Sequence, residues 1–253
     1  MSASDNAIKE LLYKMADDLL ILGHRNSEWT GIGPMLEEDI SFSSMAQDKI
    51  GQAQALYQLL NTLGEADPDT IAFTRNAPQF HNCHLVEYPI GEYDFSLIRH
   101  FLFDNAELIR HQLLSESSYE PLAKLARKFS GELKYHKFHA DTFVLKLGSA
   151  TEESHNRMQD SLNLCWDLAL GIFEESPFEE ELISSGTWKG EQHLKQLWFE
   201  AVEPVLVRAG LQVPEPSGWK PSFGGRKGQH TEHLQPMLEE MTEVFRIDPG
   251  AEW

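Results

Sequence analysis

The sequence has few cysteines, few basic residues and no long apolar run, and each shortage excludes a class of protein. Cys83 and Cys165 are too few for a disulfide framework and stand in no metal-binding spacing, so reduced thiols in a bacterial-type cytoplasm are expected. No stretch approaches the roughly 20 apolar residues that span a bilayer, and residues 1–20 lack the pattern of a leader peptide. The 21 basic residues face 40 acidic ones, and this net charge of −19 disfavours nucleic acid and anionic membranes as partners. We therefore expect a soluble, acidic, cytoplasmic protein.

Motifs of the common enzyme classes are also missing. There is no G-x-S-x-G, no Cys/His nucleophile arrangement and no dinucleotide fingerprint. The segment HNCH at residues 81–84 has no second half with metal-ligand spacing elsewhere. The segment GGRKG at residues 224–228 could hold a phosphate before a helix, but it lacks the P-loop spacing. A loop that turns or contacts an acidic surface is the favoured interpretation.

Strand-like alternation is absent, and helical periodicity dominates the chain. Hydrophobic residues make up 41% of the sequence, enough for a core, and no repeat or linker divides it. We predict a single all-α domain over residues 1–253, with four long helices at its centre and shorter helices outside. The predicted helices cover residues 5–22, 34–63, 93–115, 120–147, 151–172, 191–209 and 231–248, with irregular segments at 67–92 and 211–228.

Several residues mark where these helices should begin and end. Pro34 and Thr151 are typical of helix starts. Gly23, Gly64 and Gly148 are typical of helix ends.

Apolar residues also lie outside the core stripes of the predicted helices. Leu20 and Ile21 neighbour the stripe residue Leu19, and Leu102 and Ile109 lie on the helix at 93–115. Exposed apolar patches usually mark interfaces, so these residues are predicted to meet a partner chain. The alternative is burial under the outer helices.

The helix at residues 34–63 turns two polar side chains toward its own core. Lys49 and Gln52 interrupt a stripe of apolar residues. Asp104 interrupts the stripe of the helix at 93–115, and His136 interrupts that of the helix at 120–147. Each break lies near mid-helix, so the four side chains should meet in one buried polar layer. Unrelated polar groups in the core are the alternative.

The predicted layer resembles the metal site of ferritin-like di-iron proteins with most ligands replaced. Those proteins use one Glu from each of two helices and a Glu-x-x-His pair from each of the other two. Here Lys49 and Gln52 stand where the Glu and the His of one pair would be. In the other pair Leu133 replaces the Glu, and His136 keeps the His. A cation in place of a carboxylate repels iron, so the layer is interpreted as a vacated site.

Lys49 is predicted to stay protonated and to form a buried ion pair with Asp104, because an unpaired buried ammonium is costly. Gln52 and His136 would complete the hydrogen bonds. Alternatively, Lys49 reaches solvent or the end of the bundle near Glu38. His139 is expected to reach solvent or a neighbouring helix.

Several segments resemble the structural (C) subunit family of the bacterial phenylacetyl-coenzyme A epoxidase. They are SEWTG, FSSMAQDKIGQAQ, DTIAFTR, QFHNCHLVE and, above all, GGRKGQHTEHLQPMLEEM. The resemblance runs from the first helix to Trp253. The family's C-terminal motif is represented by Gly224, Gly225, Lys227, Gly228, His230, Thr231, Glu232 and His233.

This resemblance implies a ferritin-like subunit that performs no chemistry and holds no metal or cofactor. The di-iron ligands of the catalytic relative correspond here to Lys49 and Gln52, to Leu133 and His136, to Asp104 and to Leu19. The loop that follows Leu19 differs in length between the two. The family pairs with and stabilises that di-iron subunit in a hetero-oligomer that epoxidises the ring of phenylacetyl-CoA, together with small accessory and reductase components. The alternative is an independent ferritin-like di-iron oxidase or metal-storage protein with a degenerate ligand set.

Overall fold

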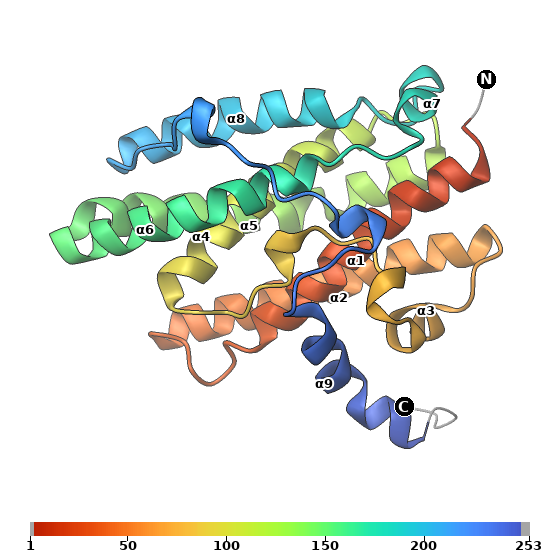
Figure 1. Ribbon diagram of the computed structural model, residues 1–253, viewed down its shortest axis with the longest axis horizontal. Helices are drawn as coiled ribbons and strands as arrows, with labels where there is room; N and C mark the ends of the chain where they lie inside the picture. Colours follow the sequence, from red (N-terminus) through yellow and green to blue (C-terminus); the bar gives the residue numbers. More distant parts are fainter. Residues whose placement is uncertain (1–2, 249–253) are drawn as a thin grey trace.

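The computed structural model describes residues 3–248, and these contain helices and loops but no strand. The long helices α1, α2, α4 and α5 form a bundle in which α1 pairs with α2 and α4 with α5, while α6 and α8 pack against α4 and α5 (Figure 1). This arrangement confirms the predicted all-α, ferritin-like bundle with additional C-terminal helices. The helices are α1 (Asp5–Ser27), α2 (Leu36–Thr62), α3 (Pro68–Thr74), α4 (Tyr93–Leu114), α5 (Glu120–Ala150), α6 (Glu152–Leu170), α7 (Glu179–Ser184), α8 (Glu191–Arg208) and α9 (Leu234–Ile247).

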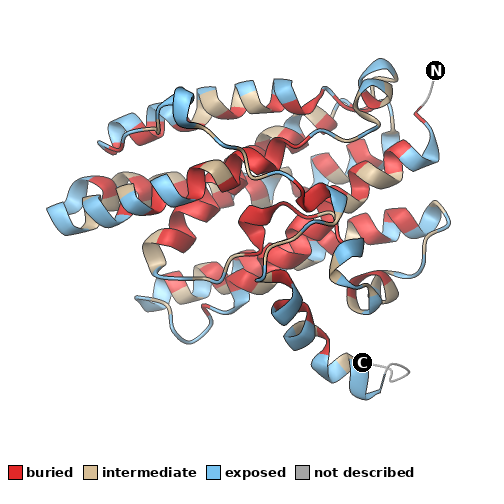
Figure 2. Ribbon diagram, viewed as in Figure 1, coloured by how far each residue is buried: buried red, intermediate tan, exposed pale blue. Residues whose placement is uncertain are grey.

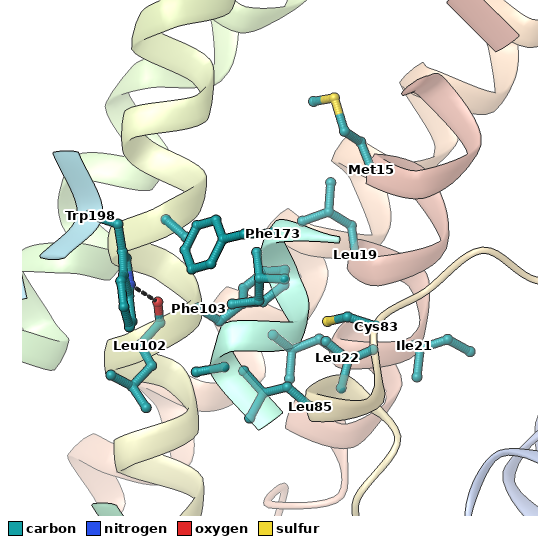
Figure 3. Packing of buried hydrophobic residues seen from close by; sticks show 14 of the residues in the cluster. Met15, Leu19, Ile21, Leu22, Cys83, Leu85, Leu102, Phe103, Phe173 and Trp198 are labelled. Atoms are coloured by element: carbon teal, nitrogen blue, oxygen red, sulfur yellow. Dashed lines mark hydrogen bonds between the residues drawn. The ribbon is translucent and has the colours of Figure 1, made fainter. Parts of the chain in front are cut away.

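The core is continuous between the bundle and the outer helices. Burial is concentrated where α1, α2 and α4 pass the centre, whereas α9 points away from the body and is largely exposed (Figure 2). In the core, Leu19 and Leu22 of α1 lie near Leu85, and Phe103 of α4 lies near Phe173 (Figure 3). None of the helices between residues 3 and 248 combines the length and apolar character that crossing a bilayer requires.

Two glycines that were expected to end helices lie inside them. Helix α1 continues past Gly23 to Ser27, and α5 includes Gly148. A Cβ on Gly23 would lie 2.8 Å from Ile50 Cδ1, and one on Gly148 would lie 2.7 Å from the Ala209 carbonyl. These glycines therefore allow close packing between helices. The expected roles of Gly64, with φ of 90°, and of Thr151, which caps α6, are confirmed.

The segment at residues 67–92 is less irregular than expected, because it contains α3. Asp67 caps this helix by accepting hydrogen bonds from the backbone N–H and the hydroxyl of Thr70. Helix α7 was also missed, and α9 begins three residues later than predicted, at Leu234. Six- and seven-residue helices carry too little periodic pattern to be found from sequence.

The predicted apolar interface was wrong. Leu20, Ile21 and Leu102 are buried within the chain. The Trp198 indole N–H of α8 donates to the Leu102 carbonyl at 2.8 Å, so an outer helix covers this face of α4 (Figure 3). Ile109 is partly buried against the same core. The alternative, burial under the outer helices, is the correct one.

Candidate functional site in the centre of the bundle

Lys49 lies at the middle of α2 with its side chain fully buried. Its ammonium forms an ion pair with Asp104 of α4, whose carboxylate is also fully buried. The ammonium also lies 5.2 Å from the centre of the Phe103 ring. The predicted pairing is therefore confirmed, and the alternative path of Lys49 to solvent is wrong.

Several positively charged or hydrogen-bonding side chains surround the carboxylate of Asp104. Burial alone would raise the pKa of Asp104, but the charges of Lys49 and His100 and hydrogen bonds from the neighbouring histidines outweigh it. The pKa consequently lies well below the usual range of an aspartate. Asp104 is the ionised centre of the layer.

His136 of α5 joins the layer from the other side, as predicted. Its Nδ1 lies 3.4 Å from Asp104 Oδ1, and its Nε2 lies 2.9 Å from Asp48 Oδ2. Burial would lower the pKa of His136, but the bonds to Asp104 and Asp48 raise it overall. His136 thus bridges a buried carboxylate and one that is half-buried.

Gln52 does not complete the layer. Its amide N–H donates to Glu132 Oε2 of α5 at 2.8 Å. The expectation that Gln52 hydrogen-bonds to the ion pair was therefore wrong. The sequence could not show it, because Glu132 is a residue of α5 that only the packing of the two helices brings within reach.

Three further residues extend the layer, and sequence reasoning assigned neither His100 nor Glu38 to it. His100 Nδ1 hydrogen-bonds to Asp104 Oδ2, and His139 Nδ1 lies 3.3 Å from His100 Nε2. His139 Nε2 contacts both oxygens of Glu38 at 3.0 Å, and the Tyr93 hydroxyl donates to Glu38 at 2.5 Å. His139 therefore reaches neighbouring helices, the second of its two expected placements. The signal for His100 was its spacing of four residues from Asp104 on α4.

Burial also affects the pKa values of His100 and Glu38. It lowers the pKa of His100 to about 4, although Asp104 opposes the shift. Burial would raise the pKa of Glu38, yet His139 and Tyr93 lower it overall. A continuous set of hydrogen-bonded groups therefore runs from Tyr93 to Lys49 through the bundle.

This arrangement does not fit a di-iron centre. Between residues 3 and 248, no group of three or more His, Cys, Asp and Glu side chains converges as metal ligands would. Lys49 holds one oxygen of Asp104, and His100 holds the other. Leu19 and Leu133, which stand at two further ligand positions by the resemblance, are fully buried and apolar.

The comparisons with known proteins agree with the fold and with the resemblance. A model of the phenylacetic acid catabolic protein family matches residues 1–253. The chain belongs to this family. It is 32% identical over 249 residues to the C-type subunit of the 1,2-phenylacetyl-CoA epoxidase of Escherichia coli (strain K12), covering 98% of this chain and 100% of the relative. It is 24% identical over 195 residues to the A-type subunit of the epoxidase of that strain, covering 74% of this chain and 62% of the relative.

The motif by which the sequence resembles this family forms a loop that clamps the C-terminal segment onto the bundle. We call residues 222–233 the C-terminal clasp. Arg226, which was not among the motif residues singled out, donates to both oxygens of Asp18 at 2.8 and 2.7 Å. Arg226 also donates to the carbonyls of Lys14, His81 and Ile172.

Other residues of the clasp fasten it to the segment at 78–88 and to Glu174. Gly225 and Gly228 pass so close to carbonyls of Asn82 and Pro78 that a Cβ would lie 2.3 Å from either oxygen. Glu87 accepts from the Thr231 hydroxyl at 2.6 Å and lies 2.7 Å from His230. Of the remaining motif residues, Gly224 donates its N–H to Glu174, and Lys227 forms an ion pair with Glu174. Glu232 is exposed, and His233 packs on Tyr88. The favoured interpretation was a loop that turns or contacts an acidic surface. The structure shows a loop that contacts the buried carboxylates of Asp18 and Glu174, and HNCH belongs to the same contact.

Proposed function

We propose that this chain is a non-catalytic structural subunit of a phenylacetyl-CoA 1,2-epoxidase. In this proposal it pairs with a chain similar to the A-type subunit, which carries the di-iron centre, and stabilises it. Small accessory and reductase components would complete the complex. The similarity to the C-type subunit over nearly the whole chain supports the proposal.

The observation that carries the proposal is the ion pair of Lys49 and Asp104. A di-iron centre needs several carboxylates and imidazoles around two cations. Here the ammonium of Lys49 supplies a positive charge at mid-helix and holds Asp104 itself. Iron would have to displace this buried cation, and both oxygens of Asp104 are already held, one by Lys49 and the other by His100. These facts disfavour the alternative, an independent di-iron oxidase or metal-storage protein.

The proposal is tested by purifying this chain and the A-type homologue of the same organism, separately and together. Iron analysis should find iron in the homologue and only traces in this chain. With ferrous ion, reductant and oxygen, this chain alone should not convert phenylacetyl-CoA. Stoichiometric iron in the isolated chain, or oxygen-dependent turnover by it, would contradict the proposal. Separate species in light scattering of the mixture at micromolar concentration would contradict the pairing.

A further inference from the structure

The outward face of α2 carries no charge over more than 20 residues. From Ile40 to Thr62 every exposed residue is uncharged, and the only charged residues are Lys49 in the core and Asp48, which is bound to His136. Seven exposed residues alternate spacings of four and three, the spacing of a helix–helix contact seam. We call them the α2 seam: Ile40, Ser44, Gln47, Gly51, Gln54, Gln58 and Asn61.

This lack of charge distinguishes α2 from α5, α6 and α8, the other long helices with many exposed positions. Charged residues are 24% of the chain, and its net charge is −19. The exposed positions of α5, α6 and α8 include Lys124 and Lys134, Glu152 and Glu203, as solvated helix faces do. Depletion of charge is the compositional mark of an interface centre.

Gly51 gives an independent reason to expect a neighbour. Glycine disfavours a helix interior, so its presence needs a cause. For Gly23 the cause lies inside the chain, since Ile50 packs against it. Gly51 has none, because a Cβ built there would meet nothing within 4 Å. Close approach of a backbone from outside the chain would supply that cause.

A groove runs beside the α2 seam. Its volume is about 550 Å³, and it lies between the last turns of α1 and the middle of α2. Gly23, His24 and Ser27 line one side, and Gln47, Gly51 and Gln54 line the other. The groove contains no carboxylate, lysine or arginine. An uncharged helix side chain fits this lining without leaving a buried charge unpaired.

We propose that the α2 seam and this groove are the surface on which a helix of the A-type partner chain docks. This inference rests on the proposed function and adds the location of the contact. The 27 residues of α2 span about 40 Å, long enough for one side of a standard interface of roughly 800 Å². A second copy of this chain is a poorer occupant, because two bodies of charge −19 repel each other.

The competing surface is the outward face of α5. It exposes Tyr135 and Phe138 among lysines, so an acidic partner could bind there instead. This face contains Gly131, which is also exposed, is also helical and also has nothing within 4 Å of an added Cβ. An exposed helical glycine therefore occurs on both faces, and the lack of charge is what favours α2. Gly51 and Gly131 are a matched pair for testing this choice.

The experiment compares Gly51→Lys with Gly131→Lys in the full chain. Both variants should keep the thermal midpoint of the parent within a few degrees, because a Cβ added at either position has no atom within 4 Å and both positions are exposed. Affinity for the purified A-type homologue is measured by titration calorimetry. The α2 surface predicts at least tenfold weaker binding for Gly51→Lys and an unchanged dissociation constant for Gly131→Lys.

The outcomes separate this inference from the proposed function. If the parent chain binds the homologue and Gly51→Lys binds it equally well, the α2 surface is overturned and the pairing stands. Weakening by Gly131→Lys alone would move the interface to α5. If the parent chain self-associates and Gly51→Lys abolishes this self-association, the α2 surface binds a second copy of the chain. No binding by the parent chain at any concentration would overturn the pairing and this inference together.

Discussion

The polar layer around Lys49 joins three helices of the bundle, whereas Arg226 joins the bundle to the C-terminal clasp. In the layer, the buried carboxylate of Asp104 has Lys49, His100 and His136 around it. At the clasp, Arg226 is the one cation in a salt bridge with Asp18 among the described residues, and it also satisfies three backbone carbonyls. A carboxylate with several partners tolerates the loss of one better than a carboxylate with a single charged partner.

Arg226→Met should therefore produce the largest loss. It leaves Asp18 buried without its cation and frees three carbonyls, so the free energy of unfolding should fall by about 4–5 kcal/mol. Denaturant titration followed by circular dichroism measures this loss. Adding Asp18→Leu should recover only part of it, because Asp18 also accepts from the Cys83 N–H. Full recovery would show that the carbonyl contacts contribute little.

Lys49→Met should cost somewhat less, about 3–4 kcal/mol, because His100 and His136 remain beside Asp104. The same titration applies. The double variant Lys49→Met with Asp104→Leu should recover only part of this loss, because it leaves His100 and His136 without their carboxylate. A neutral single substitution would mean that the ion pair does not hold the three helices together.

The pH dependence of stability should distinguish the histidines of the layer. His100 has a pKa of about 4 in the fold against 6.5 when unperturbed. The unfolded chain therefore takes up the proton first, and His100 should cost up to about 3 kcal/mol of stability as the pH falls from 6.5 to 4. His100→Gln should flatten this part of the curve of unfolding free energy against pH.

His136 serves as the control with the opposite sign. Its pKa is raised in the fold, so its contribution is present below the unperturbed value and is lost as the pH rises through the folded pKa. His136→Gln should therefore lower stability most on the acidic side. Parallel curves for both variants and the parent would refute the assignment of these two environments.

Lys227→Ala should produce the smallest effect and sharpen the contrast within the clasp. Lys227 pairs with Glu174 at 3.2 Å, but 59% of its side chain is exposed. Exposed pairs contribute little, so the unfolding free energy should change by less than about 0.5 kcal/mol. A loss comparable to that of Arg226→Met would show that the charge of the loop, and not the buried geometry of Arg226, fastens it.

The sequence by itself determined the bundle and the central ion pair. Periodicity over helices of 22 to 31 residues fixes which face is buried, and Lys49, Asp104 and His136 lie on those faces. Once a lysine is buried, the cost of an unpaired charge demands a carboxylate, so Asp104 could be identified in advance.

Only the tertiary structure decided where the other polar groups bind. Gln52 hydrogen-bonds to Glu132 and His139 to Glu38, because the rotation and spacing of the helices determine which side chains come within hydrogen-bonding distance. Arg226 reaches Asp18 across 208 positions of sequence, and no local pattern encodes such a contact. Periodicity reports the direction of a side chain from its own helix, whereas a hydrogen bond also requires the position of the second element.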